Sequence, residues 1–144
     1  MIGEDVMFIS TKEIQLLYAD TDMMGVIYHA NYLKWFELGR TQLIEDLGFS
    51  YVEMEEKGYF APVYDVHCVY KNAVRYGDKA FVKTWVESND GLKTVYGYQI
   101  INGDDVICAE GTTTHIVVTK DRFRPVQFKK SFPEWFQKYE EVKK

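Results

Sequence analysis

Apolar side chains recur at helical spacing after residue 31 and predict one long helix in the first third of the chain. Asn31 is a residue type that commonly caps a helix start, and Gly48 is one that commonly ends a helix, because glycine adopts the left-handed conformation without strain. We therefore expect a helix from about 31 to 47. Its apolar face is wide, so that a second subunit is the natural cover for part of it. The face comprises Leu33, Phe36, Leu43, Ile44 and Leu47, widened by Tyr32, Trp35 and Leu38.

The pattern on both sides of this helix predicts shorter elements. From residue 12 to 18, Ile14 and Leu16 fall on one face of a strand. The acidic stretch 20–25 disfavours a strand and is expected to be a loop. After the long helix, residues 51–57 fit a short helix that the next glycine ends.

From residue 60 onward, the composition favours a sheet of long antiparallel strands. β-branched and aromatic residues dominate, and turn signals recur at regular intervals. In the first of these strands, Tyr64 and Val66 fall on one face and His67 on the other. Asn102 and the glycine after it are a strong signal for a two-residue hairpin. The expected strands run over about 61–73, 80–87, 93–101 and 106–119.

The order of these elements indicates a fold class. The chain closes with a pattern for a second helix, in which Ser131 is the expected cap and Pro133 lies in the first turn. A strand, a long helix and then further strands indicate an α+β fold, in which an antiparallel sheet of about five strands covers one central helix. We expect residues 1–144 to form a single domain. A second copy of the chain is a natural cover for the unpaired edge of such a sheet.

Composition fits this fold and excludes several function classes. The 144 residues are 47% hydrophobic and 16% aromatic, which is ordinary for a domain with a sizeable core. With 17 basic and 22 acidic residues the net charge is −5, which argues against nucleic acid or an anionic membrane as a partner of the whole surface. No stretch approaches the roughly 20 apolar residues that span a bilayer, and the first residues lack a signal-peptide pattern, so we expect a cytoplasmic protein. Cys68 and Cys108 are too few for a disulfide framework or a zinc site and are expected to be buried thiols.

Reactive side chains gather where the first strand breaks and the long helix begins. Asp22 lies a few residues before the expected helix start. The first amide N–H groups of a helix lack intrahelical partners and lie at the positive end of its dipole, so they can stabilise an oxyanion. A carboxylate beside such amides suits acyl chemistry on a thioester. On turn chemistry alone, however, an Asp at this place is more simply a residue that closes the loop.

The segment from Tyr18 to Arg40 resembles a known family. Its sequence, YADTDMMGVIYHANYLKWFELGR, has a Tyr, an Asp-x-Asp with a downstream Gly, then Tyr-His-x-x-Tyr and an aromatic-rich helix. In this it is similar to hotdog-fold acyl-CoA thioesterases of the 4-hydroxybenzoyl-CoA and Tol-Pal-associated type. Weaker support comes from Gly77-Asp78 before a strand and from the late Arg124-Pro125. The resemblance covers most of the chain.

The resemblance implies an activity and the residues that perform it. By this similarity Asp22 is the catalytic carboxylate, Tyr18 and His29 are its companions, and the amide at about His29 polarises the thioester carbonyl. The similarity also implies a hotdog fold, an acyl-CoA substrate, and a homodimer or homotetramer with active sites at the subunit interface. From the residues alone, Tyr18 is more often a packed strand aromatic. For His29, a ring that merely packs at the helix start is an equally good interpretation.

Other residues are candidates for contacts with coenzyme A and the acyl group. The stretch 120–130 carries a net charge of +4. Arg122 and Arg124 in this stretch could hold coenzyme phosphates, as could Lys93, near which the resemblance places a phosphate contact. Such stretches are most often solvated loops. Candidates for the wall of an acyl pocket are Trp35, Phe36, Pro62 and Val63, with core packing as the simpler explanation of each.

Thioester hydrolysis needs no cofactor. The leaving thiol has a pKa of about 8.5, so it needs little acid assistance. One carboxylate, acting as general base or as nucleophile, and one oxyanion site can therefore supply the main contributions to catalysis. Asp20, Asp22 and His29 do not show the convergence of ligands that a metal needs, so we expect no metal. Two alternatives remain open. One is a non-catalytic module that binds acyl thioesters, and the other is a hotdog dehydratase that acts on hydroxyacyl thioesters through His29 and Glu37.

Overall fold

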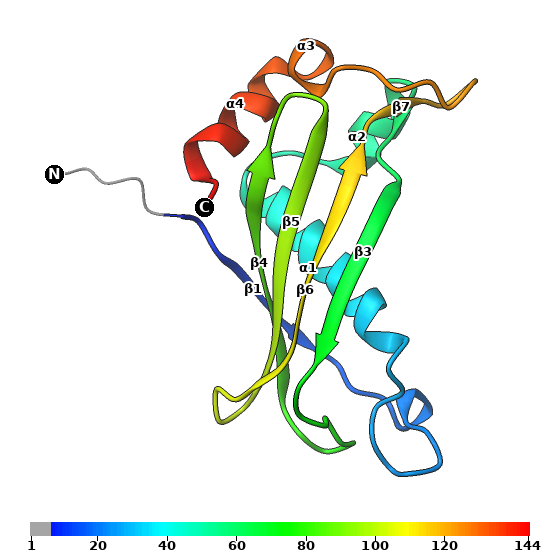
Figure 1. The fold of residues 1–144 in the computed structure, drawn as a ribbon, viewed down its shortest axis with the longest axis vertical. Coiled ribbons are helices and arrows are strands. Elements are labelled where there is room, and N and C mark those ends of the chain that lie inside the picture. Colours follow the sequence, from blue (N-terminus) through cyan, green and yellow to red (C-terminus); the bar gives the residue numbers. More distant parts are fainter. Residues whose placement is uncertain (1–6) are drawn as a thin grey trace, which may run out of the picture.

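A five-stranded antiparallel sheet forms the body of the protein (Figure 1). The computed structural model describes residues 7–144. Every neighbouring pair of strands is antiparallel, which confirms the expected α+β hotdog arrangement of about five strands around one long helix. The strands lie in the order β1 (Ser10–Ile14), β4 (Ala80–Asn89), β5 (Lys93–Asn102), β6 (Ile107–Ile116) and β3 (Val63–Tyr70).

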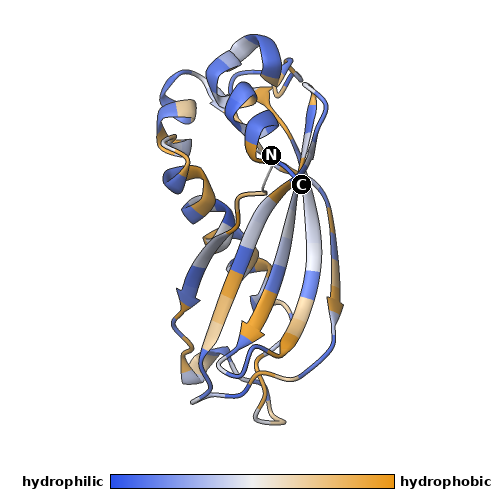
Figure 2. Cartoon of the chain, turned by 90° about the vertical axis from the view of Figure 1, so that its left-hand side faces the viewer, coloured by the Kyte–Doolittle hydropathy of each residue, from blue (hydrophilic) through white to orange (hydrophobic). Residues whose placement is uncertain are grey.

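Helix α1 (Asn31–Asp46) crosses one face of this sheet and packs on β1, β4 and β5. Turned by 90°, the molecule shows α1 along one side of the sheet (Figure 2). Gly39 lies at the crossing, where an added Cβ would overlap Thr84 Oγ1 and Val82 Cγ2 of β4. A mid-helix glycine costs about 1 kcal/mol relative to alanine. The close approach of helix and sheet therefore explains why a glycine is found here.

The buried face of α1 differs in part from the predicted one. Phe36, Leu43 and Ile44 are buried as expected, but Leu33 is 40% exposed, which corrects its assignment to the apolar stripe. Tyr32 and Trp35 are buried instead, within their own chain. Phe36 stacks on Tyr98 with ring centroids 4.3 Å apart, and this contact with the sheet fixes the rotation of the helix.

Both predicted helix ends are confirmed, but the cap predicted for the start of α1 is wrong. Gly48 and Gly58 have φ angles of +92° and +98° and follow α1 and α2 (Tyr51–Glu56). Asn31 does not cap α1: its side-chain amide donates to the carbonyl of Asp20 at 2.9 Å and so ties the preceding loop to the helix start.

Several predicted strands are shorter or interrupted. The first ends at Ile14, and residues Tyr18–Asp20 form a 3-10 helix, η1. The strand predicted over 61–73 is confined to β3, and a separate strand β2 (Tyr59–Phe60) precedes it. The strand predicted over 106–119 breaks at residue 117, and its last part, β7 (Val118–Thr119), leaves the main sheet to pair with β2.

The two-residue hairpin predicted at Asn102 is a longer loop. The Asn102 side-chain oxygen accepts hydrogen bonds from the amides of Asp104 and Val106, at 2.9 and 3.1 Å. Asp105 takes the left-handed conformation with φ +61°. The Asn side chain therefore organises the loop in place of the expected Asn-Gly turn.

Two C-terminal helices close one end of the sheet, α3 (Phe128–Ser131) and α4 (Pro133–Val142). Ser131 belongs to α3 and does not cap α4, whose cap position is held by Phe132. Tyr139 of α4 reaches the sheet, where its hydroxyl lies 2.8 Å from that of Tyr96. These helices thus add an aromatic cover to the core.

Strand β3 forms an exposed edge of the sheet. Its apolar side chains do not alternate between buried and exposed, which differs from the expected pattern, because both faces of this edge strand are open in the chain by itself. Cys68 of β3 is half-buried, Cys108 of β6 is buried, and both are free thiols. The exposed apolar side chains of β3 are Val63, Tyr64, Val66, Val69 and Tyr70, at 44–61%.

Within residues 7–144, no helix is both long and apolar enough to cross a membrane.

Candidate active site

The loop before α1 is a tight turn that holds Asp22 at its base. The Asp22 amide donates to the Val26 carbonyl at 2.8 Å, and the Gly25 amide donates back to the Asp22 carbonyl at 3.1 Å. Gly25 has φ +80°, which the turn requires. The Ile27 amide then donates to the Val74 carbonyl at 2.7 Å, so the loop is fastened to the segment that follows β3.

The two oxygens of the Asp22 carboxylate have different roles. Oδ1 accepts hydrogen bonds from the amides of Met24 at 2.8 Å and Val26 at 3.4 Å, which fixes the side chain in its loop. Oδ2 has no hydrogen-bond donor among the described residues. The carboxylate is therefore positioned by one oxygen and has the other available for a substrate or a water molecule.

His29 lies at the start of α1 and is tied to the end of β3. The Tyr70 hydroxyl of β3 donates to the His29 carbonyl at 3.1 Å, and the two rings meet edge to face with centroids 6.0 Å apart. The amides of Asn31 and Tyr32 donate back to carbonyls three residues earlier. Within the described residues, the amides of His29 and Ala30 have no acceptor, so these N–H groups at the helix start are available to an oxyanion.

Asp22 and His29 line the same cavity. Its volume is about 320 Å³, and Tyr70 and Tyr32 form part of its wall. The structure therefore brings together two of the three residues that the resemblance implied for catalysis. The exposed loop tip beside them consists of Met23 and Met24, which are 104% and 77% exposed.

Tyr18 is not brought into this cavity. It belongs to η1, is 76% exposed, and its ring meets that of Tyr76 edge to face at 5.7 Å. Asp20 acts as a turn residue, since its carboxylate accepts from the Leu17 amide at 3.0 Å and lies 4.0 Å from the Lys34 ammonium.

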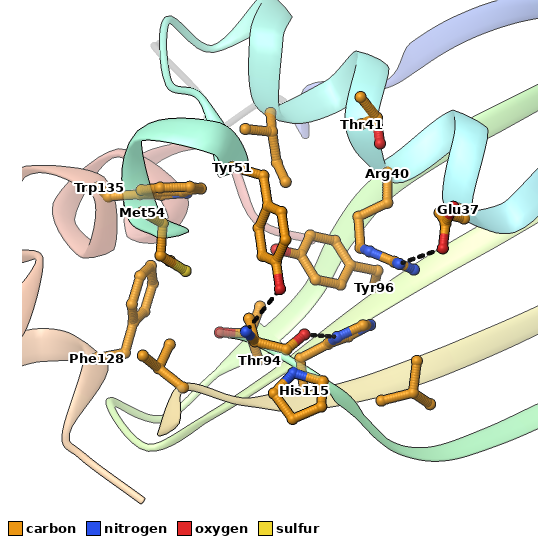
Figure 3. Close-up of a pocket in the computed structure, with 15 residues that line it drawn as sticks. Glu37, Arg40, Thr41, Tyr51, Met54, Thr94, Tyr96, His115, Phe128 and Trp135 are labelled. Atoms are coloured by element: carbon orange, nitrogen blue, oxygen red, sulfur yellow. Dashed lines mark hydrogen bonds and ion pairs between the residues drawn. The ribbon is translucent and has the colours of Figure 1, made fainter. Parts of the chain in front are cut away.

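A second and larger pocket lies at the opposite end of β3 (Figure 3). Its volume is about 420 Å³. One stripe of α1 forms a wall, comprising Glu37, Arg40, Thr41 and Ile44 at helical spacing. The sheet forms the floor, and aromatic side chains of α2, α3 and α4 close it. Residues that line it besides the α1 stripe include Tyr51, Pro62, Val63, Thr94, Tyr96, His115, Phe128 and Trp135.

A chain of hydrogen bonds joins Arg40 and His115, which both line this second pocket. Arg40 Nη1 donates to the Tyr98 hydroxyl at 3.1 Å, which lies 2.6 Å from Thr113 Oγ1. Thr113 Oγ1 lies 3.0 Å from His115 Nε2, and His115 Nδ1 lies 2.9 Å from the Ala61 carbonyl. Arginine can only donate and a carbonyl can only accept. With a neutral imidazole, every proton in the chain is therefore assigned: the Tyr98 and Thr113 hydroxyls donate toward His115, and Nδ1 carries the ring proton.

His115 is neutral in the folded protein. Burial, together with the nearby charge of Arg40, lowers its pKa to about 4, and the side chain is only 4% exposed. Burial also raises the pKa of the Tyr98 hydroxyl, which keeps its proton. Sequence reasoning did not find the link between His115 and Arg40. That link joins residues from α1, β5 and β6.

The residues expected to line an acyl pocket divide into two groups. Trp35 and Phe36 are core side chains, 5% and 0% exposed, and neither lines one of the two pockets described above. The structure thus corrects their expected position. Pro62 and Val63 do line the larger pocket, at the start of β3, where Val63 is 52% exposed.

The candidate phosphate contacts lie near this same end of the sheet. The Lys93 ammonium lies 4.7 Å from the ring centroid of Tyr64 on β3. The Gly91 carbonyl accepts from the Lys129 amide at 3.2 Å, which joins the turn before Lys93 to the basic stretch 120–130. Arg122 and Arg124 are exposed in the loop of that stretch. Among residues 7–144, no three His, Cys, Asp or Glu side chains gather where they could hold a metal ion.

Comparison with known proteins shows a family. Residues 16–137 match the model of the thioesterase-like superfamily. The Bacillus subtilis protein YneP, named as a candidate acyl-CoA thioesterase, is 51% identical over 138 residues, which cover 96% of this chain and 100% of YneP. The acyl-CoA thioester hydrolase YbgC of Escherichia coli O157:H7 is 25% identical over 82% of this chain and 88% of YbgC.

A solved structure shows the same fold. The DHNA-CoA thioesterase of Staphylococcus aureus superposes with a TM-score of 0.90 at 43% sequence identity. The match covers 93% of this chain and 90% of that one. The five-stranded sheet and the helix across it are therefore the arrangement of a solved thioesterase.

Proposed function

We propose that this chain, which belongs to the thioesterase-like superfamily, is an acyl-CoA thioesterase that hydrolyses its substrate to a free acid and coenzyme A at Asp22. One observation carries the proposal. The Asp22 carboxylate is fixed through Oδ1 and has Oδ2 available, in a cavity that it shares with His29 at the start of α1. A carboxylate beside helix-opening amides is the minimum that thioester hydrolysis needs.

The chemistry follows from this pairing of groups. Oδ2 of Asp22 either removes a proton from a water molecule that attacks the thioester carbon, or attacks that carbon itself to give a mixed anhydride, which water then hydrolyses to the free acid and the Asp22 carboxylate. In both routes negative charge develops on the carbonyl oxygen, and the amides of His29 and Ala30 are donors that can stabilise it. Coenzyme A then leaves as a thiolate, which needs little acid assistance because its pKa is about 8.5.

The exposed edge strand supports a homodimer. Val66, Val69 and Tyr70 of β3 are 44–46% exposed, and beside them lie the open backbone groups of a sheet edge. Such an edge is usually covered. Two copies that pair their β3 strands across a two-fold axis would join the sheets into one. The tetramer that the resemblance implied would be a pair of such dimers.

Other parts of the proposal rest on separate observations. The match of Tyr18–Arg40 to the pattern of 4-hydroxybenzoyl-CoA and Tol-Pal-associated thioesterases supports that finer assignment. The positions of Lys93, Arg122 and Arg124 on one end of the sheet support contacts with coenzyme phosphates. The free thiols of Cys68 and Cys108 fit the reducing cytoplasm.

The dehydratase alternative needs His29 and Glu37 to act on one substrate. Within one chain they line different pockets, and the Glu37 side chain is 74% exposed beside Arg40, so the pair could meet only across a subunit interface. The non-catalytic module differs from an enzyme only in turnover.

Release of free thiol from a panel of acyl-CoAs tests the proposal. The panel runs from short aliphatic through long-chain to aromatic acyl groups, with the heat-denatured protein as the control. We expect thiol release above background for at least one class. Tight binding of the panel without any release would replace the enzyme by a binding module, and an enoyl product from a hydroxyacyl-CoA would restore the dehydratase.

A further inference from the structure

We propose that Tyr70 is a positioning residue for the reaction: its hydroxyl holds and polarises the peptide group between His29 and Ala30 and so strengthens the oxyanion site. This inference rests on the thioesterase activity proposed above and deepens it by adding a residue to the site. Tyr70 ends strand β3, whereas the oxyanion donors lie at the start of α1. The sheet thus takes part in a site that the sequence pattern places on the loop and the helix.

The carbonyl of His29 accepts two hydrogen bonds. The Tyr70 hydroxyl donates to it at 3.1 Å, and the amide of Tyr32 in the first turn of α1 donates to it at 3.2 Å. The N–H of the same peptide group is that of Ala30, which has no acceptor among residues 7–144. One peptide group therefore receives two donors at its oxygen and has its own N–H available.

The geometry of a peptide links these two ends. A trans peptide is planar, with its oxygen and its N–H on opposite sides. Donors that fix the His29 carbonyl therefore also fix the direction of the Ala30 N–H. Hydrogen bonds in a chain polarise one another, which strengthens each by about 10–30%. The bond from Tyr70 thus makes the Ala30 N–H a better donor, although Tyr70 acts through the peptide and not on the reacting atoms.

The turn 28–31 is also fastened from another side, by Asp20. The Asp20 carbonyl accepts from the Tyr28 amide at 2.8 Å and from the Asn31 side chain at 2.9 Å. These bonds hold the two ends of the turn, and the bond from Tyr70 holds its middle. Donors in an oxyanion site are effective when they are already oriented before the reaction. With Tyr70 in place, the turn meets this condition.

Ring contacts keep the Tyr70 hydroxyl at the turn. The ring of Tyr70 meets those of His29 and Tyr32 edge to face, with centroids 6.0 and 5.1 Å apart. Partial burial, together with the nearby Cys68 thiol, raises the pKa of Tyr70 to about 12. The hydroxyl therefore keeps its proton around neutral pH, which suits a fixed donor and not a group that transfers protons.

The variant Tyr70→Phe removes the hydroxyl and keeps the ring contacts. We expect kcat of acyl-CoA hydrolysis to fall about three- to tenfold, as the loss of one neutral hydrogen bond would do, with KM changed less than about twofold. Removal of an oxyanion donor itself costs about 100- to 1000-fold. Wild-type kcat in Tyr70→Phe, or a change confined to KM, would overturn the proposal.

Tyr76→Phe is the matched control. Tyr76 follows the same strand and is 57% exposed, so the loss of its hydroxyl should leave kcat unchanged. The pH profile of kcat separates positioning from proton transfer, and it should keep its shape in Tyr70→Phe. Loss of one limb of the profile in Tyr70→Phe would make Tyr70 an acid or a base and overturn the positioning role.

Infrared spectra of a bound carbonyl measure the oxyanion site without turnover. The probes are acetyl- and benzoyl-CoA in which a methylene replaces the thioester sulfur, so that the carbonyl keeps its place and no thiol can leave. Hydrogen bonds to an isotope-labelled carbonyl move its stretching band to lower wavenumber. We expect this shift on binding to the wild type and to Tyr76→Phe, and a loss of about a tenth to a third of it in Tyr70→Phe.

Replacement of Tyr70 by 3-fluorotyrosine should give a change of the opposite sign. Fluorine makes the phenol more acidic and so a stronger hydrogen-bond donor, while the ring keeps nearly the same size. The carbonyl band of the bound probe should then lie at lower wavenumber than in the wild type. This replacement decides the question if Tyr70→Phe is unstable. A band at the same position in all folded variants and the wild type would contradict a role for Tyr70.

Turnover and band shift together separate this inference from the proposed function. If no acyl-CoA is hydrolysed but the band shift responds to Tyr70, the positioning role stands and the activity fails. If acyl-CoA is hydrolysed and the band shifts in the wild type, but neither responds to Tyr70, only the positioning role fails. A wild type that binds neither probe, or shifts neither carbonyl band, rejects the oxyanion site and the positioning role together.

Discussion

His115 shows at the residue scale how a buried hydrogen-bond chain affects stability. Its pKa of about 4 in the folded protein lies below the value of about 6.5 in an unfolded chain. Between these values the unfolded chain binds a proton that the folded protein does not. The free energy of unfolding therefore receives the full contribution of neutral His115 above pH 6.5 and loses it as the pH falls toward 4.

A His115→Gln variant tests this contribution. Glutamine can donate to the Ala61 carbonyl and accept from Thr113, but it does not titrate. We expect the free energy of unfolding of the wild type to fall more steeply than that of the variant between pH 6.5 and 4, with an added slope of up to about 1.4 kcal/mol per pH unit. Urea unfolding at several pH values measures both. Parallel curves would mean that His115 is charged in the folded protein.

At the same scale, sequence reasoning identified candidate residues that lie close together in the sequence. It missed residues that lie far apart in the sequence and meet only in the fold. Asp22 and His29 lie close in sequence, and the structure places both in one cavity. Arg40, Thr113 and His115 are joined only by the fold, through hydrogen bonds between α1, β5 and β6. Neither spacing nor residue type along the chain shows such a connection.

At the scale of elements, the contact between α1 and β4 depends on Gly39. Alanine there would gain about 1 kcal/mol of helix propensity, but its Cβ would overlap Thr84 and Val82, which are fully buried. Overpacking of this kind costs about 1–3 kcal/mol. Because the overlap with Thr84 and Val82 is close, we expect a cost in the upper part of that range, from which the gain in helix propensity is subtracted. Gly39→Ala should therefore lower the free energy of unfolding by about 1–2 kcal/mol in urea titrations.

Gly103→Ala is the matched control for this prediction. Gly103 is exposed, does not have a positive φ, and an added Cβ would only touch Lys79 at 3.4 Å. We expect a change within about 0.5 kcal/mol. A Gly39→Ala protein as stable as the control would show that helix and sheet can separate at no cost.

Helix ends could be predicted more reliably than strand ends, for a physical reason. Gly48 and Gly58 end their helices through their own backbone conformation, which residue type determines. The strand predicted over 106–119 breaks because its last residues pair with β2, a partner far away in sequence. Ser131 failed as a cap because a short helix, α3, includes it. Strand limits depend on pairing partners, which a local pattern does not contain.

At the scale of the whole molecule, the unpaired β3 edge predicts a dimer. Val66 lies near the middle of β3, so that in a two-fold pair it would lie close to its own copy. Val66→Lys would place like charges together, and we expect it to weaken the dimer at least about tenfold, as about 1.4 kcal/mol of repulsion would do. Sedimentation equilibrium measures the shift toward monomer, and acyl-CoA hydrolysis should fall with it.

Thr11→Lys supplies the comparison at the other edge. Thr11 is exposed on β1, which borders the sheet on the opposite side from β3. We expect this variant to keep the wild-type mass in solution. If Thr11→Lys dissociates the protein and Val66→Lys does not, the subunits pair through β1.

The most direct measurement of the central claim is thiol release by Asp22→Asn on the best acyl-CoA of the panel. Asparagine keeps a side-chain oxygen that can accept from the amides of Met24 and Val26, so the loop should hold its shape. It can act neither as a general base nor as a carboxylate nucleophile. We predict a fall in kcat of about a hundredfold or more, with the thermal unfolding midpoint and the oligomeric state unchanged. A folded Asp22→Asn protein with wild-type turnover would contradict the account.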